Sequence, residues 1–217
     1  MERRGESCLM VMLALLASLV PAPRLGAVET DHRPAATALV HVAPVDDSGG
    51  IREDFVVAKT FEGGECQPFS ASIGAGYRCS ADHFLFDPCW AEASGPEAPS
   101  ALCMPWPWAN EVSRLVHPEG LVPGSPWEGP LPAWGLELED GTRCELVLGA
   151  HDHVGDGLED EEIIDYACPG SDVRLFRGID QSGPVWRARA ATVADGRIER
   201  LPGWVRITTA WFGRPAF

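Results

Sequence analysis

The sequence is short of positive charge. It holds 17 lysine and arginine residues against 32 aspartate and glutamate residues, which gives a formal net charge of -15 at pH 7. Lys59 is the single lysine. Because contacts from lysine and arginine to phosphate dominate affinity for nucleic acids, this balance argues against a nucleic acid as partner.

The motifs of several well-known sites are absent as well. The chain has no Gly-x-Gly-x-x-Gly or Gly-Lys-Ser/Thr loop, so nothing in it predicts nucleotide binding, and we expect no cofactor. It also has no Gly-x-Ser-x-Gly nucleophile elbow. After residue 20, no apolar run reaches the ~18 residues that a membrane-spanning helix needs, so we expect no transmembrane span.

The first 27 residues have the pattern of a secretory signal peptide. Arg3 and Arg4 give a basic start, residues 9–20 form an apolar run, and Gly26-Ala27 supplies the small residues of a cleavage site. This order of basic, apolar and small residues is typical of an exported protein. We therefore expect a secreted, extracellular protein from which residues 1–27 are removed.

The cysteine content fits export. Cys8 leaves with the signal peptide, and an even set remains, namely Cys66, Cys79, Cys89, Cys103, Cys144 and Cys168. In an oxidising compartment such a set predicts three disulfides. The number of cysteines alone leaves their connectivity open.

The rest of the chain predicts two parts. Residues 28–61 read as a flexible polar lead with one strand over 36–45, and residues 62–217 as one disulfide-stapled domain. Prolines prevent regular helix over most of 105–134. The exception is a short helix over 110–117, capped by Asn110, with Val112, Leu115 and Val116 on one face.

The C-terminal half predicts strands. Residues 134–139 and 142–148 alternate apolar and polar side chains and are joined by Asp140-Gly141, a strong hairpin signal. Further strands are expected over 163–168, 184–193 and 204–212. The expected fold is all-β or β-dominated, a small antiparallel sheet or barrel-like domain with one short helix, stapled by disulfides.

Short motifs follow one another in a fixed order from residue 62 to residue 212. They are Gly64-Glu65-Cys66, Tyr77-Arg78-Cys79, Phe86-Asp87-Pro88-Cys89-Trp90, Trp134-Gly135-Leu136-Glu137-Leu138, Asp140-Gly141-Thr142-Arg143-Cys144, Asp165-Tyr166-Ala167-Cys168, Ser182-Gly183-Pro184-Val185-Trp186 and Thr209-Ala210-Trp211-Phe212. In this order they resemble an uncharacterised family of secreted or lipid-anchored proteins of actinobacteria. The resemblance implies export and a sequential disulfide pairing, Cys66–Cys79, Cys89–Cys103 and Cys144–Cys168. It implies no activity, cofactor or catalytic residue.

The eight tryptophans supply one candidate site. Trp134, Trp186 and Trp211 fall in strand patterns and are expected in the core. Trp106, Trp108 and Trp127 lie in the proline-rich connection, where exposed rings could stack on sugars or anchor a protein partner. The competing interpretation is that these three also fill the core of the domain.

A second candidate is a metal site at His151, His153 and Asp156. Two histidines at i and i+2 on a strand face the same way, and the following acidic run to Glu162 supplies carboxylates, which together suit zinc, copper or calcium. The spacing matches no known metal loop. A solvated acidic loop is the competing interpretation.

Ser182 and His83 allow a weaker catalytic interpretation. Residues 179–185 faintly resemble the nucleophile segment of trypsin-like serine proteases, which needs a histidine base and an orienting carboxylate. The match fails because Gln181 precedes the serine and the glycine pair after it is broken. A turn that enters a strand explains the segment as well.

These patterns favour a secreted extracellular or cell-envelope binding or interaction module of unknown ligand, without enzymatic activity. The expected partner is a protein or an envelope component. A secreted hydrolase with an unidentified site is the first alternative, and an acidic metal-binding module is the second.

Overall fold

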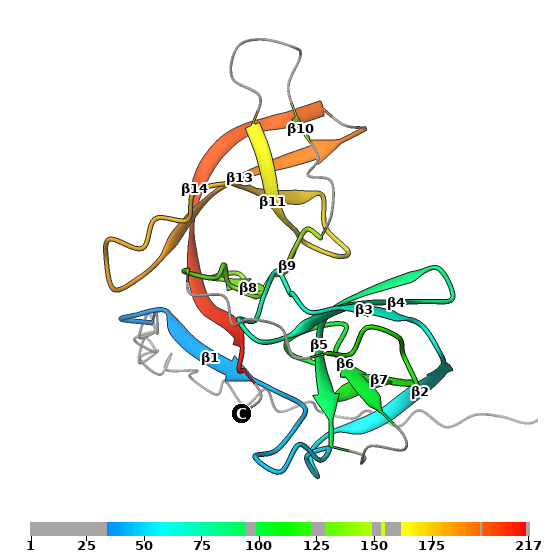
Figure 1. Ribbon diagram of the computed structural model, residues 1–217. Helices are drawn as coiled ribbons and strands as arrows, with labels where there is room; N and C mark the ends of the chain where they lie inside the picture. The colour runs from blue at the N-terminus through cyan, green and yellow to red at the C-terminus, as the bar shows by residue number, and fades with distance from the viewer. Residues whose placement is uncertain are drawn as a thin grey trace, which may run out of the picture. The chain divides into compact units, whose positions relative to one another are not determined.

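The computed structural model describes residues 34–93, 99–122, 129–148, 153–154, 162–195 and 197–215, with the backbone alone at 153, 154, 162 and 200–202. The predicted signal peptide lies outside the described residues. Within them the chain is all-β and forms two sheets (Figure 1). The strands are β1 (Ala38–Val42), β2 (Val56–Glu62), β3 (Glu65–Gln67), β4 (Tyr77–Ala81), β5 (Phe84–Glu92), β6 (Ser100–Cys103), β7 (Glu111–Val116), β8 (Gly135–Leu138), β9 (Arg143–Leu146), β10 (His153–Val154), β11 (Glu162–Ala167), β12 (Val173–Phe176), β13 (Arg187–Ala194) and β14 (Arg197–Gly213).

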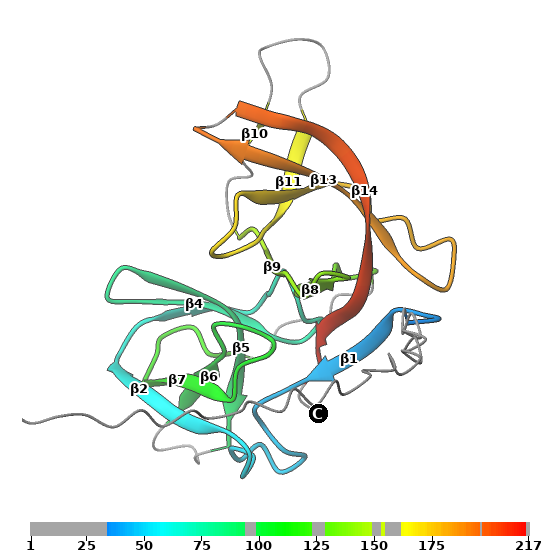
Figure 2. The same ribbon diagram turned by 180° about the vertical axis from the view of Figure 1, so that it is seen from behind.

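Six strands close into an antiparallel barrel. The order is β14-β13-β12-β11-β9-β8, and β8 pairs back with β14 to complete the ring. Closure leaves these strands without an unpaired edge. β14 is 17 residues long and curves along one side of the barrel, where its last part also pairs in parallel with β1 (Figures 1 and 2).

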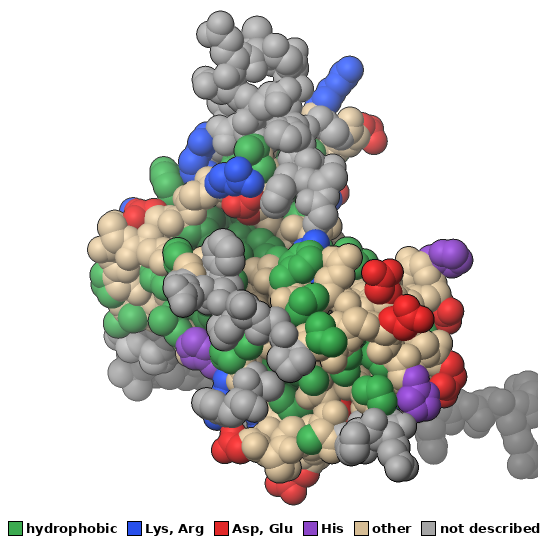
Figure 3. Space-filling model, in the orientation of Figure 1, with side chains coloured by type: hydrophobic (Ala, Val, Ile, Leu, Met, Phe, Trp, Pro, Cys, Tyr) green, Lys and Arg blue, Asp and Glu red, His purple; other side chains and the backbone are tan. Residues whose placement is uncertain are grey.

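The second sheet has the order β2-β7-β6-β5-β4-β3. Its strands are antiparallel neighbours except for β2 and β7, which run parallel. Figure 3 shows acidic side chains gathered over this sheet, whereas the arginine side chains stand mainly over the barrel.

Three disulfides join neighbouring strands or their ends. Cys66–Cys79 connects β3 to β4, Cys89–Cys103 connects β5 to β6, and Cys144–Cys168 connects β9 to the residue after β11. In the first two pairs the cysteines are also register partners in the sheet. These are the three pairs that the family resemblance implies.

Separate apolar clusters fill the two sheets, and a third cluster lies between them. The barrel core includes Leu136, Tyr166 and Ile207, each at most 2% exposed. The cluster between the sheets contains the ring pair Trp90 and Trp134, whose centroids are 6.1 Å apart. The indole Nε1 of Trp90 donates to a backbone carbonyl in the segment after β14, at 2.8 Å.

The predicted hairpin is confirmed. β8 and β9 are antiparallel, with Leu136 opposite Cys144 and Glu137 opposite Arg143. Leu136, Leu138 and Cys144 are buried on the barrel side, as the alternation of residue types predicts. Gly141 takes a positive φ of 83° in the turn, a conformation that glycine adopts without strain.

The predicted helix over 110–117 is wrong. Residues 111–116 form β7, which lies between β2 and β6 and pairs with both. A segment of six residues is too short to separate a helical from a strand pattern, and the buried Val112 and Leu115 fit either one. Residues 113–116 have register partners in both neighbouring strands, which supply hydrogen-bonding groups to their backbone.

The strand predicted over 36–45 is present as β1, but the described part of the predicted lead over 28–61 is not separate from the folded domain. Residues 34–61 belong to the same unit as the rest of the described chain. They contribute β1 and β2, and the segment between these strands places Val45 and Phe55 in the cluster between the sheets. The Thr37 hydroxyl is buried and donates to the Ile207 carbonyl at 2.7 Å. The folded domain therefore includes about 28 residues that composition assigns to the lead.

Candidate functional site

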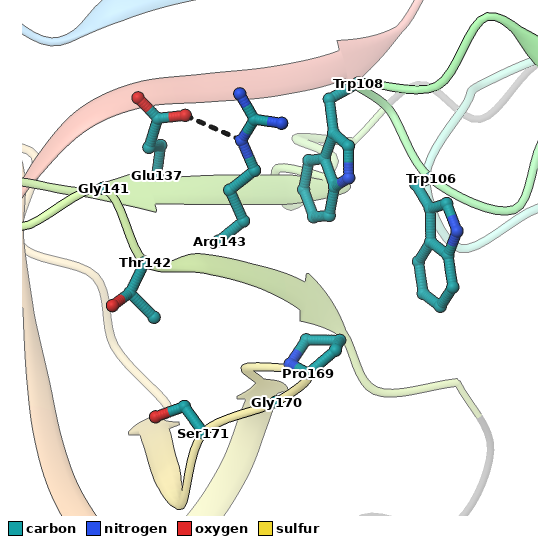
Figure 4. A pocket seen from close by; sticks show the side chains of 9 residues that line it. All are labelled: Trp106, Trp108, Glu137, Gly141, Thr142, Arg143, Pro169, Gly170 and Ser171. Carbon is teal, nitrogen blue, oxygen red and sulfur yellow. Dashed lines mark hydrogen bonds and ion pairs between the residues drawn. The ribbon is translucent and has the colours of Figure 1, made fainter.

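A pocket of about 700 Å³ with aromatic and polar lining residues lies beside the β8–β9 hairpin. Three segments build it: the proline-rich loop after β6, the hairpin itself, and the loop after β11 (Figure 4). The residues that line it are Trp106, Trp108, Glu137, Gly141, Thr142, Arg143, Pro169, Gly170 and Ser171.

A glycine positions the aromatic wall. Gly135 in β8 lies under the proline-rich loop, and a Cβ atom at this position would come within 2.5 Å of Pro107 Cγ and 2.9 Å of Trp108 Cζ3. The bare backbone of Gly135 therefore lets the loop lie directly on the outer face of the hairpin. Pro107 is buried there, and Trp108 is half-buried.

Trp108 is held by contacts on the barrel surface. Its ring meets Trp211 of β14 edge to face, with centroids 5.4 Å apart, an arrangement that aromatic rings favour. The Arg143 guanidinium lies 5.5 Å from the Trp108 ring centroid and 5.9 Å from that of Trp211, within range of a cation–π interaction. The Trp108 ring is thus fixed before any ligand arrives.

Trp106 extends this wall outward. Its ring plane is within 4° of that of Trp108, at a centroid distance of 6.4 Å, and the residue is 38% exposed. Two parallel indole rings therefore border the opening of the pocket, with the outer ring in contact with solvent (Figure 4).

A polar wall adjoins Trp108. Glu137 and Arg143 are cross-strand partners on the outer face of the hairpin, and Arg143 Nε lies 2.8 Å from Glu137 Oε2. This ion pair uses Nε, and one of the two terminal nitrogens of Arg143 points toward Trp108 (Figure 4). The pair supplies donors and an acceptor to the pocket with no net charge.

Two turns complete the polar wall. Gly170 takes a φ of 76° in the loop that follows Cys168, and the Ser171 amide donates to the Cys168 carbonyl at 3.1 Å. The Cys144–Cys168 disulfide therefore ties two of the three segments, because Arg143 precedes one cysteine and Pro169 follows the other. A cross-link of this kind limits the motion of the loop relative to the hairpin.

Three groups near the barrel have shifted pKa values. Burial raises the pKa of the Glu145 carboxyl, two residues beyond Arg143 on β9. Burial, with a contribution from the Asp165 charge, raises the pKa of Tyr166, whose hydroxyl donates to the Ala133 carbonyl at 2.8 Å. Hydrogen bonds from Ser182 lower the pKa of Asp180. None of these groups lines the pocket.

The structure brings together two of the three tryptophans that the sequence singles out as a binding patch. Trp106 and Trp108 share the pocket, while Trp127 lies outside the described residues. Trp134 and Trp211 are buried, as expected, whereas Trp186, also expected in the core, is only half-buried against it.

The predicted metal residues cannot be placed from the described part of the chain. His151 and Asp156 lie outside it, and only the backbone of His153, in β10, is described. Among the described residues, the sulfur atoms of Cys79, Cys89 and Cys103 lie within 4.8 Å of one another, but all three belong to disulfides. Metal ligation needs free thiolates, so this cluster is structural.

The two residues of the protease interpretation lie apart in the fold. Ser182 is in the loop before β13 of the barrel, whereas His83 is in the turn between β4 and β5 of the other sheet. No hydrogen bond joins these two described side chains, and the Ser182 amide donates instead to Asp180 Oδ1 at 3.0 Å. Ser182 thus belongs to a local turn.

Sequence reasoning missed Glu137, Arg143, Thr142 and Ser171. The signal for the first two was present, since the residues that alternate with the buried face of a hairpin point outward. Thr142 and Ser171 gave no comparable signal, because nothing local shows that their turns meet one pocket.

Comparisons with known proteins give no relative for this chain. No family model matches it, and no curated protein or solved structure shows a significant match. In the part of the chain that the structure describes, no helix is both long and apolar enough to cross a membrane.

Proposed function

We propose that this protein is an exported, non-enzymatic binding module that takes its ligand in the Trp106–Trp108 pocket. The observation that carries the proposal is the pair of parallel indole rings beside the polar wall of Glu137 and Arg143. A preformed pocket with an aromatic surface and a few placed polar groups is the usual form of a ligand site.

Export is supported by the cysteines. All six cysteines in the described residues are paired in disulfides, which persist in oxidising compartments outside the cytosol. The basic, apolar and small-residue pattern of residues 1–27 agrees with this. Membership in the actinobacterial family that the motifs resemble is part of the same proposal.

The pocket favours binding over hydrolysis. A glycoside hydrolase needs two carboxyl groups on either side of the scissile bond. The pocket is lined by one carboxylate, Glu137, and that group is ion-paired with Arg143. A triad of nucleophile, base and orienting carboxylate is likewise missing from the lining residues.

The test is a thermal melt of the oxidised protein against neutral oligosaccharides, proline-rich peptides and divalent cations. A compound that binds only the folded state raises the melting midpoint by mass action. We expect at least one class to raise the midpoint of the wild type and of Trp204→Ala, but not of Trp106→Ala/Trp108→Ala. Trp204 is a matched control because it is 58% exposed and does not line the pocket. A shift that survives in the double variant, or a panel without any shift, would overturn the proposal.

A further inference from the structure

We infer that the ligand of the pocket is a neutral glycan, with a sugar ring stacked on the indole wall and its hydroxyl groups directed to the Glu137–Arg143 wall. This inference rests on the proposed function. It names the ligand class by chemistry alone, from the shape, polarity and charge of the lining residues.

The indole wall fits the apolar face of a sugar ring. A pyranose ring carries C–H groups on its faces, and these make weak favourable contacts with the electron-rich face of an aromatic ring. Trp106 is exposed and lies parallel to Trp108, so the wall presents two aromatic surfaces in one orientation. Trp108 is already fixed by Trp211 and Arg143, so stacking orders few side chains.

The polar wall fits the rim of a sugar ring. Sugar hydroxyls both donate and accept hydrogen bonds, and neighbouring hydroxyls suit planar groups with two contact points. The Arg143 guanidinium is a planar donor fork, and Glu137 contributes carboxylate oxygens that accept. The hydroxyls of Thr142 and Ser171 add groups that can do both.

The charge of the pocket favours an uncharged ligand. Its one carboxylate and its one guanidinium are paired at 2.8 Å, so neither sign is left in excess. The whole chain carries a net charge of -15, and acidic side chains gather over part of the neighbouring sheet (Figure 3). This field repels an anionic polymer such as a uronate or a phosphorylated glycan.

A proline-rich peptide fits the pocket less well. Such peptides dock into grooves lined by aromatic side chains. In this pocket the aromatic rings stand on one side, and Thr142, Gly170 and Ser171 stand on the other (Figure 4). A ligand with apolar faces and a polar rim matches this division, and a sugar ring has both.

The experiment measures binding by calorimetry and by tryptophan fluorescence of the oxidised protein. The probes are neutral hexasaccharides built from glucose, galactose, mannose, arabinose or N-acetylglucosamine, with oligogalacturonate as the anionic match to galactose. Decaproline represents the peptide alternative. We expect a neutral hexasaccharide to bind with an affinity that changes little between ~50 and ~500 mM salt, because no net charge is neutralised.

The variants separate the parts of the site. We expect Trp106→Ala to weaken the binding of the neutral hexasaccharide about tenfold or more, through loss of one stacking surface. Arg143→Gln should weaken it by a similar factor of about ten, through loss of the donor fork. Trp204→Ala should leave it unchanged, and near-UV circular dichroism checks that each variant is folded.

The outcomes distinguish this inference from the proposed function. Binding of decaproline or of oligogalacturonate alone, lost in Trp106→Ala, would overturn the glycan inference and keep the pocket as a binding site. Neutral glycan binding that survives in Trp106→Ala and Arg143→Gln would overturn both. Absence of binding to every neutral hexasaccharide would overturn the glycan inference.

Discussion

Replacing Gly135 by alanine tests whether the proline-rich loop depends on a bare backbone in β8. The Cβ atom added at this position would lie 2.5 Å from Pro107 Cγ and 2.9 Å from Trp108 Cζ3. Non-bonded carbon atoms pack at about 3.5–4.0 Å, so the loop has to move outward by about 1 Å. The proline ring cannot rotate away, and Trp108 is confined by Trp211.

The expected cost follows from overpacking. Extra methyl groups in well-packed sites destabilise proteins by about 1–3 kcal/mol. Replacing glycine by alanine also restricts the unfolded chain, which stabilises the folded state by about 0.4–1 kcal/mol. We therefore expect Gly135→Ala to lower the free energy of unfolding by about 1–2 kcal/mol, together with a change in the near-UV tryptophan signal.

Urea unfolding followed by circular dichroism measures this difference. Gly203→Ala is the matched control, since Gly203 lies in β14 of the same barrel, has no positive φ, and has no atom within 4 Å of an added Cβ. The control should be neutral or slightly stabilised. Equal free energies of unfolding for Gly135→Ala and Gly203→Ala would refute the proposed packing of the loop on the hairpin.

Two further predictions concern the hairpin strand β9. Because burial raises the pKa of Glu145, the folded protein loses stability as the pH rises from the unfolded glutamate pKa, about 4.3, through the raised folded value. Glu145→Gln should remove this part of the pH dependence and be more stable than the wild type at about pH 7, as measured by urea unfolding. Replacing Cys144 and Cys168 by alanine should cost about 3 kcal/mol, because the bridge spans 24 residues, and should alter the near-UV signal of the pocket. The double variant Cys66→Ala/Cys79→Ala should lose similar stability yet keep that signal, and the opposite pattern would contradict the assigned role of the Cys144–Cys168 bridge.

Sequence reasoning succeeded where the signal is local. The alternation around Asp140-Gly141 predicts the β8–β9 hairpin and its buried face, because a two-residue period and a turn signal act over a few residues. It failed for residues 111–116, whose strand form depends on pairing with β2, some 55 residues earlier in the chain. The strand predicted over 36–45 is present as β1, but the same non-local pairing explains why polar composition concealed that β1 and β2 belong to the folded domain.

In the candidate site, too, the sequence predicts what depends on local signals and misses what depends on distant contacts. Trp106 and Trp108 could be predicted as a binding patch because the prolines around them exclude a helix. The two large rings therefore lie in a connecting segment. Their contact with Arg143 depends on which loop packs on the outer face of the hairpin. That packing requires Gly135, which is 27 residues from Trp108 in the sequence. A glycine in a strand indicates that another segment packs closely on its backbone, but the sequence does not show which segment this is.

The placement of β14 has a consequence for the order in which the protein can be assembled. Its residues pair with β1, about 170 positions earlier, and with β8, about 70 positions earlier. As the ribosome or an export channel releases the chain from its N-terminus, β1 and β8 emerge before β14. Their edges that pair with β14 stay unpaired until that strand follows. The barrel closes only after the segment 197–213 has been released, and a chain arrested before that segment would expose strand edges open to aggregation.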